Sequence, residues 1–246
     1  MNIRLTIQYD GTAYHGYQIQ PNGITVQEVI EKALSKMTGE DIHVVGCGRT
    51  DAGVHAIEYT ANFHTGAKIA PQKYAMALNA QMPQDIRCLK SEQVSEEFHA
   101  KKSAIKKTYI YKIYNGEIMG AFLRNYAWHY KFPLDIKKMQ KAAEAFVGEH
   151  DFGAFVAQGH SATTTIRTIY SLGVRKDGDI ITIEVTGNGF LYNMVRIITG
   201  TLVYVGGGKI KAEDVADIIA SCNRTRAGIT APPQGLFMKE VFYNEE

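Results

Sequence analysis

The chain has 246 residues, of which 45% are hydrophobic and 21% charged, and its formal net charge is +2. This length suffices for one large domain or two small ones, and the composition is that of a globular protein. No stretch approaches the roughly 20 consecutive apolar residues of a membrane-spanning helix, so no membrane association is expected. A strand pattern begins directly after Met1, which predicts that there is no signal peptide. The three cysteines are odd in number and lack Cys-x-x-Cys spacing, so we expect a cytoplasmic protein without disulfides or a zinc site.

Hydrophobic periodicity predicts strands and helices along the N-terminal half. Residues 3–9 alternate between apolar and polar side chains, as a half-buried strand does. Thr25 and Glu28 have the spacing of a capping box, which predicts the start of a helix that Gly39 ends. In chain order the half is expected to contain a strand at 3–9, a helix at 26–37, strands at 42–45 and 57–63, a helix at 71–79 and a strand at 86–94.

The C-terminal half has a similar pattern. The periodicity pauses between 98 and 106, and no linker rich in Gly, Ser or Pro marks the boundary. After it we expect a strand at 107–115, a helix at 135–147, a hairpin of strands at 166–174 and 180–185, a buried helix at 190–205, an amphipathic helix at 211–222 and a strand at 236–243.

This order of elements predicts an α+β fold with two similar halves, each an antiparallel sheet with helices on one face. The expected halves are residues 1–104 and 105–246. Each resembles the split β-α-β arrangement of RNA-recognition modules. Whether the two sheets join is left open by the pattern.

A glycine-rich loop lies between the strands at 42–45 and 57–63. Residues 46–55 read Gly-Cys-Gly-Arg-Thr-Asp-Ala-Gly-Val-His. Glycine lets a ligand approach the main chain closely, so these glycines are expected to leave room for a ligand. Asp51 is ionised at neutral pH and is a candidate nucleophile or base. Arg49 is a candidate partner that keeps Asp51 charged, or a contact to nucleic acid. The alternative is a hairpin with a surface ion pair.

Lysines and tyrosines alternate around the start of the second half. Between 98 and 115 the chain carries five lysines and three tyrosines and no acidic residue. Cations beside aromatic rings suit a surface that binds nucleic acid. Lys101, Lys102 and Lys106 are therefore candidate phosphate contacts. A solvated edge of an amphipathic strand is the alternative.

Two further candidates lie in the second half. Arg196 lies in a strongly apolar helix, where an unpaired arginine is costly, so a partner is expected. Glu184 is one candidate partner and Asp51 the other. Tyr109 shares a strand face with Tyr111, so core packing is expected for at least one of these rings.

The histidines lack the spacing of metal ligands, and no metal site is expected. The sequence contains no P-loop, no dinucleotide-binding glycine fingerprint and no nucleophile elbow. The absence of these three motifs argues against a redox enzyme, a kinase or a serine hydrolase.

Taken together, seven segments resemble the tRNA pseudouridine synthase A family in sequence and order. The most specific is Arg-Thr-Asp-Ala-Gly-Val-His at 49–55, and Tyr17 stands where many members have tryptophan. The segments are residues 9–18, 48–56, 78–79, 98–101, 107–111, 189–196 and 231–236, and the resemblance extends over about residues 3–243.

The resemblance implies an isomerase that converts uridine to pseudouridine at positions 38, 39 and 40 of the tRNA anticodon stem-loop. It implies the pseudouridine synthase fold with the active site in the cleft between the halves, no cofactor, no metal, and a homodimer with one tRNA spanning both subunits. The site residues that it implies are Asp51 as catalytic aspartate, Tyr109 against the target base, Arg49 displacing the target nucleotide, Arg196 pairing with the catalytic carboxylate, and His55 and Leu236 at further substrate-binding positions.

Two other functions remain as alternatives. A non-catalytic RNA-binding protein could use the same basic and aromatic surface, although binding alone does not need an aspartate among phosphates. An aspartate-dependent glycosidase usually needs two carboxylates that flank the bond, and no second acid has a comparable context in this sequence.

Overall fold

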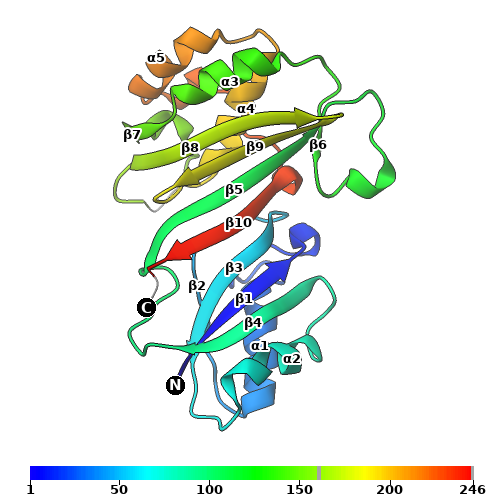
Figure 1. The fold of residues 1–246 in the computed structure, drawn as a ribbon, viewed down its shortest axis with the longest axis vertical. Helices are drawn as coiled ribbons and strands as arrows, with labels where there is room; N and C mark the ends of the chain where they lie inside the picture. The colour runs from blue at the N-terminus through cyan, green and yellow to red at the C-terminus, as the bar shows by residue number, and fades with distance from the viewer. Residues whose placement is uncertain (160–161, 245–246) are drawn as a thin grey trace. The chain divides into compact units, whose positions relative to one another are not determined.

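A computed structural model describes residues 1–159 and 162–244 of the chain. The described residues form a mixed α+β fold, shown in Figure 1. The chain divides into two compact units, one of Met1–Ile105 together with the segment that begins at Phe237, and one of Lys106–Leu236. Residues 160, 161, 245 and 246 of the expected C-terminal half lie outside the described residues.

The first unit is a sheet with two helices. Its strand order is β4-β1-β3-β10, and β2 pairs with β3. Strand β1 is antiparallel to both β3 and β4. The elements are β1 (Asn2–Tyr9), α1 (Val26–Thr38), β2 (Val45–Gly46), β3 (His55–His64), α2 (Tyr74–Asn79), β4 (Ile86–Val94) and β10 (Leu236–Tyr243).

Local sequence signals explain why these elements form where they do. Ile3, Leu5 and Ile7 are at most 1% exposed and lie on one face of β1, which is the expected alternation. The Thr25 side chain accepts a hydrogen bond from the Glu28 N–H at 3.3 Å, so the predicted cap begins α1. Gly39 ends the helix with a left-handed φ of 74°.

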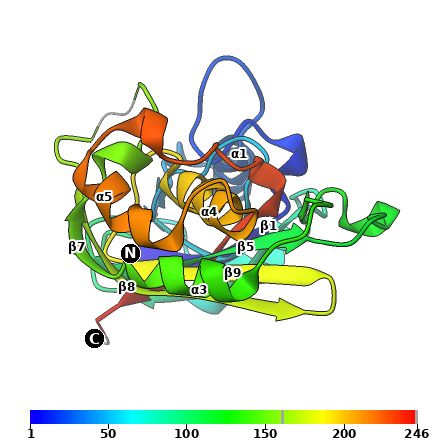
Figure 2. The same ribbon diagram turned by 90° about the horizontal axis from the view of Figure 1, so that it is seen from above.

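The second unit is also a sheet covered by helices. Its strand order is β5-β9-β8-β7, and β6 pairs with β5. Helix α3 packs against both α4 and β8 (Figure 2). The elements are β5 (Ala104–Tyr114), β6 (Trp128–His129), α3 (Ile136–Glu144), β7 (Gly148–Asp151), β8 (Ile166–Asp177), β9 (Ile180–Gly187), α4 (Met194–Gly206) and α5 (Val215–Ala220).

The last strand differs from the expected arrangement. Strand β10 was assigned to the C-terminal half, but Phe237 and Met238 pair with His55 and Ala56 of β3 in the first unit. The pairing is parallel, whereas an antiparallel sheet was expected. The physical reason is that β3 offers a free edge to β10, and no local pattern in residues 236–243 encodes which edge they reach.

Three predicted boundaries also shift. The helix expected at 190–205 begins at Met194, because Asn193 takes a left-handed φ of 61° that an α-helix cannot contain. The helix expected at 135–147 spans only Ile136–Glu144, and β7 begins soon after it at Gly148. The strand expected at 42–45 is reduced to Val45–Gly46.

Within the described part of the chain, every helix is too short or too polar to cross a lipid bilayer.

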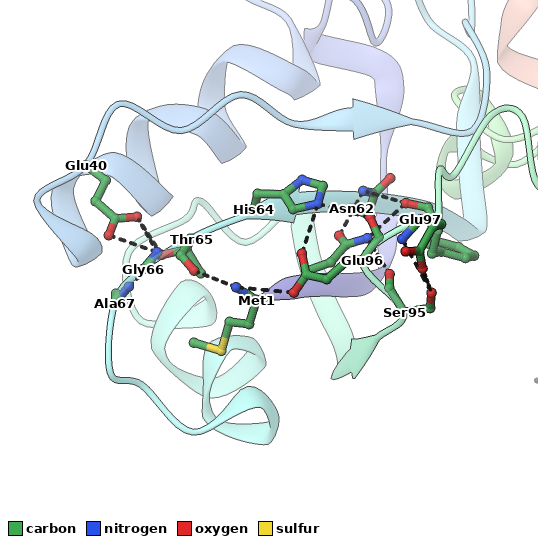
Figure 3. Close-up of polar contacts among 12 residues, drawn as sticks. Met1, Glu40, Asn62, His64, Thr65, Gly66, Ala67, Ser95, Glu96 and Glu97 are labelled. Carbon is green, nitrogen blue, oxygen red and sulfur yellow. Dashed lines mark hydrogen bonds and ion pairs between the residues drawn. The ribbon is translucent and has the colours of Figure 1, made fainter.

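Buried asparagine amides on β1 and β3 hold the chain segment that follows β4 in the first unit (Figure 3). Asn62 of β3 donates from Nδ2 to Asn2 Oδ1 at 2.9 Å and accepts from the Ala100 N–H at 2.8 Å. Asn2 donates to the carbonyls of Ser95 and Phe98, each at 2.9 Å. Both asparagines are at most 1% exposed, and such buried amides need their hydrogen bonds satisfied. The network therefore fixes the segment that leads to Lys101.

Candidate functional site

Asp51 lies on the loop that connects β2 to β3, where its side chain is half-buried. Neighbouring side chains alternate between the two sides of this loop. Thr50 and Val54 are 7% and 1% exposed and point into the protein, whereas Arg49 and Ala52 are exposed. The Val54 N–H donates to the Asp51 carbonyl at 3.1 Å and closes the turn. The loop therefore exposes Arg49, leaves Asp51 half-buried, and is anchored by Thr50 and Val54.

The chain segment after β1 holds this turn in place. The Tyr9 hydroxyl lies 2.8 Å from the Thr50 hydroxyl, and the Tyr17 N–H donates to the Thr50 carbonyl at 3.2 Å. Gly16 has a left-handed φ of 85°, and a Cβ there would lie 2.6 Å from the Thr50 carbonyl oxygen. Only glycine fits such an approach. The aromatic, amide-rich segment after β1 thus supports the loop, a role that sequence reasoning missed.

Two tyrosines pack beneath the glycine-rich start of the loop. The Tyr17 ring stacks on Tyr59 with centroids 4.3 Å apart, and the Tyr59 hydroxyl donates to the Gly48 carbonyl. Burial raises the pKa of both phenols well above the usual range, so both stay neutral. A Cβ at Gly46 would lie 2.1 Å from the Tyr59 oxygen. Gly46 therefore makes room for these tyrosines, and a ligand is not needed to explain it.

His55 lies at the end of the loop and inside the first unit. It is 1% exposed, and its ring stacks on Phe237 with centroids 4.6 Å apart. Its Nδ1 accepts from the Gly11 N–H at 3.0 Å and lies 3.1 Å from Asp10 Oδ1. These contacts give His55 a structural role where the loop meets β3. The expected contact between His55 and the substrate stays a prediction.

Tyr109 lies on β5 in the second unit and is 8% exposed. The edge of its ring packs against Phe190 with centroids 5.1 Å apart at 81°. Tyr111, two residues on, is fully buried and donates to the Pro232 carbonyl at 2.6 Å. Tyr111 is thus the core tyrosine of this strand face, and Tyr109 retains a small accessible surface.

Arg196 lies in the first turn of α4 and is half-buried, so the expectation of a fully buried arginine is too strong. Its Nε donates to the Ala231 carbonyl at 2.7 Å, and one terminal nitrogen donates to Asn193 Oδ1 at 2.6 Å. The left-handed Asn193 therefore helps to orient the guanidinium. Pairing of Arg196 with Asp51 or with Glu184 stays a prediction.

Leu236 begins β10 and is 6% exposed. A single 3-10 turn, Pro233–Gly235, precedes it. A Cβ at Gly235 would lie 2.6 Å from the Tyr111 ring, so this turn packs tightly on the core of the second unit. Among the predicted site residues, the first unit holds Arg49, Asp51 and His55, and the second holds Tyr109, Arg196 and Leu236.

The candidate RNA-binding lysines occupy the end of the first unit and the start of the second. Lys101 and Lys102 are exposed on a turn, and the His99 Nδ1 accepts from their N–H groups at 3.2 and 3.3 Å. Lys106 is half-buried at the start of the second unit. Because Asn62 fixes the neighbouring Ala100, the two exposed ammonium groups project from a defined backbone.

No group of three or more His, Cys, Asp or Glu side chains is placed to hold a metal ion among residues 1–159 and 162–244. The site in the first unit places a half-buried carboxylate, Asp51, and an exposed guanidinium, Arg49, on either side of the hydrogen-bonded Thr50. A carboxylate held in this way can act as a nucleophile or a base, since alignment is what an ionised aspartate requires.

Comparison with known proteins assigns the chain to a family. Residues 5–101 and 142–244 match the family model described as tRNA pseudouridine synthase. A protein called tRNA pseudouridine synthase A from Thermoanaerobacter sp. (strain X514) is 52% identical over 98% of this chain and 99% of its own length. Its namesake from Ruminiclostridium cellulolyticum is 54% identical, with the same shares covered.

A solved structure shows a weaker likeness. One chain of the crystal structure of a Cbf5-Nop10-Gar1 complex aligns with a TM-score of 0.40 at 13% identity. The alignment covers 98% of this chain and 50% of the other. A likeness of this degree supports no structural inference.

Proposed function

Because the chain belongs to the tRNA pseudouridine synthase family, we propose that it converts uridine to pseudouridine at positions 38, 39 and 40 of the tRNA anticodon stem-loop, with Asp51 as catalytic carboxylate and without a cofactor. The isomerisation of uridine in tRNA follows from the family. The observation that carries the finer proposal is the loop geometry. The half-buried Asp51 follows Thr50, whose hydroxyl lies 2.8 Å from the Tyr9 hydroxyl and whose carbonyl accepts from the Tyr17 N–H.

The reaction explains the need for a fixed carboxylate. The bond between uridine N1 and the sugar C1′ breaks, a bond between C5 and C1′ forms, C5 loses a proton and N1 gains one. No electrons are gained or lost overall, so the reaction has no stoichiometric need for a redox partner. The Asp51 carboxylate can serve by attack on the sugar, by attack on the base or by removal of a sugar proton.

The target base must leave its stack before it can turn. Base flipping costs a few kcal/mol, which stacking and arginine contacts can offset. In the proposal the exposed Arg49 displaces the target nucleotide, and Tyr109 lies against the flipped base and is a candidate acceptor of the C5 proton. Arg196 pairs with the catalytic carboxylate. The buried Leu236 is a candidate apolar contact to the flipped base.

The proposal includes a homodimer that binds one tRNA across both subunits, and its support is the resemblance alone. A mass measured by light scattering after gel filtration, at twice that of one chain, would bear it out. The proposal also places the enzyme in the cytoplasm. The three cysteines of the sequence, Cys47, Cys88 and Cys222, are odd in number and lack Cys-x-x-Cys spacing, which fits a reducing compartment.

The catalytic proposal is tested with tRNA that carries tritium at uridine C5. Wild-type protein should release tritium, and Asp51→Asn should reduce the rate on the order of 10³-fold or more, since the amide keeps the size of the side chain but not its charge. The affinity of Asp51→Asn for tRNA should change little. Binding of tRNA without tritium release from the wild type would instead favour an RNA-binding protein that lacks catalysis.

A further inference from the structure

We propose that Tyr9 is a positioning residue for the isomerisation and that it acts on Asp51 through the hydroxyl of Thr50. This inference rests on the proposed role of Asp51. Tyr9 is the last residue of β1, and its hydroxyl lies 2.8 Å from that of Thr50. The two residues are separated by 41 positions, so the contact joins the first strand directly to the loop that carries Asp51.

The surroundings make this contact well defined. Tyr9 is 2% exposed and Thr50 is 7% exposed, so water competes little for either hydroxyl. Burial raises the pKa of Tyr9 well above its usual range, and the phenol therefore keeps its proton. A buried hydroxyl pair of this kind is costly to break, because the remaining group loses its partner.

Thr50 is held at its backbone as well as at its side chain. Its carbonyl accepts from the Tyr17 N–H at 3.2 Å, and Gly16 lies against the same oxygen. With the carbonyl and the hydroxyl both fixed, the backbone of Thr50 can rotate little. The direction in which Asp51 leaves the chain follows from that backbone, so the Tyr9 hydroxyl restricts where the carboxylate points.

Among the contacts that hold Thr50, the one made by the Tyr9 hydroxyl can be removed by a conservative substitution. The Tyr17 contact is made by the main chain and survives any side-chain change at that position. Tyr9→Phe, by contrast, removes only one oxygen and keeps the ring, which packs against Tyr59 with centroids 5.7 Å apart. An error of about 1 Å in the position of a reacting group costs on the order of 10²-fold in rate.

The test is the single-turnover rate of tritium release at saturating enzyme, measured beside the tRNA dissociation constant. Tyr9→Phe and Thr50→Val should each lower the rate at least about tenfold and leave the dissociation constant within about twofold. The double variant should be no slower than the slower single variant, because both changes remove the same contact. Thr50→Ser, which keeps the hydroxyl, should retain most of the rate.

Tyr243→Phe is the matched control. The Tyr243 hydroxyl donates to the Ala100 carbonyl at 2.7 Å in the same unit, so the variant loses a neutral hydrogen bond away from Thr50 and should keep its single-turnover rate. If Tyr9→Phe fails to fold, the comparison of Thr50→Val with Thr50→Ser still decides. A normal rate in Tyr9→Phe or Thr50→Val would overturn the inference, as would losses that multiply in the double variant.

Asp51→Asn, measured in parallel, separates this inference from the proposed function. Full activity in Asp51→Asn would remove the catalytic role of Asp51 and the inference with it. An inactive Asp51→Asn beside a fully active Tyr9→Phe would leave the proposed function intact and overturn only the positioning role.

Discussion

At the scale of a single residue, Arg196 combines structural hydrogen bonds with a proposed pairing to the catalytic carboxylate. Its Nε and one terminal nitrogen are committed to Ala231 and Asn193 within the second unit. Those contacts orient the guanidinium from within the second unit. A planar guanidinium oriented by its own unit is well suited to hold a carboxylate in a fixed position.

We therefore expect Arg196→Met to lose most of the isomerase activity and to retain tRNA binding. Methionine keeps the length and apolar character of the side chain and removes its charge. Tritium release and tRNA affinity should be measured together with the melting temperature, because lost contacts to Ala231 and Asn193 also affect stability. Near-normal turnover would assign Arg196 a structural role.

Asn193→Gly, which tolerates the left-handed backbone at this position, is the control for the structural share of that loss. It removes the contact to the Arg196 side chain but keeps the charge. We expect a smaller loss of activity than in Arg196→Met at a comparable change in melting temperature. Equal losses of activity in the two variants would show that orientation alone accounts for the effect.

At the scale of elements, Gly16 packs the segment after β1 against the loop that carries Asp51. Both its left-handed φ of 85° and the approach of the Thr50 carbonyl exclude a side chain. Gly178, in the turn between β8 and β9, also has a left-handed φ, of 53°, but a Cβ there would meet nothing within 4 Å. The two glycines thus share the conformational demand and differ in the space around them.

Gly16→Ala should accordingly destabilise the protein more than Gly178→Ala. The backbone strain alone costs about 1–3 kcal/mol, and only Gly16→Ala adds a clash with Thr50. Denaturant unfolding measures the stabilities, and tritium release should fall in Gly16→Ala alone. Equal destabilisation by both variants would mean that the segment after β1 can shift away from Thr50 without lowering the free energy of unfolding.

Element boundaries were predictable where a local signal marks them. The capping box at Thr25 and the glycine at 39 delimit α1 as expected, and β4 matches its predicted range. The start of α4 was predicted too early because the apolar run from Phe190 reads as helix, whereas the left-handed Asn193 breaks it. Hydrophobic periodicity does not report a residue's backbone conformation at such a point, where Asn193 accepts a local hydrogen bond from Arg196 three residues on.

At the scale of the whole molecule, the near-neutral net charge of +2 implies that RNA binding depends on local basic groups. Lys101 and Lys102 are exposed and anchored through the segment that Asn62 fixes. If both ammonium groups contact phosphates, each contact releases counterions when tRNA binds.

The double variant Lys101→Ala/Lys102→Ala should weaken tRNA binding and reduce the slope of log K against log salt by about two. Lys32→Ala/Lys36→Ala is the matched control, because it removes two exposed lysines from α1 in the same unit. Titrations at several salt concentrations measure both slopes. An unchanged slope in the first variant would exclude these lysines as phosphate contacts.

The sequence by itself determined the family and the mixed α+β class, and it supplied the candidate site residues. Hydrophobic periodicity, helix caps and the run from Arg49 to His55 are local patterns, and local patterns can be read along a chain. The candidate carboxylate was therefore visible without coordinates, as was the glycine-rich loop around it.

The tertiary structure alone decided how that loop is held. Tyr9 reaches Thr50, the ring of His55 stacks on Phe237, and β10 pairs with β3 in the first unit. Each of these contacts joins residues that are distant in sequence, and a single chain carries no periodic signal for such pairs. These long-range contacts fix the backbone beside Asp51, which no local sequence pattern could show.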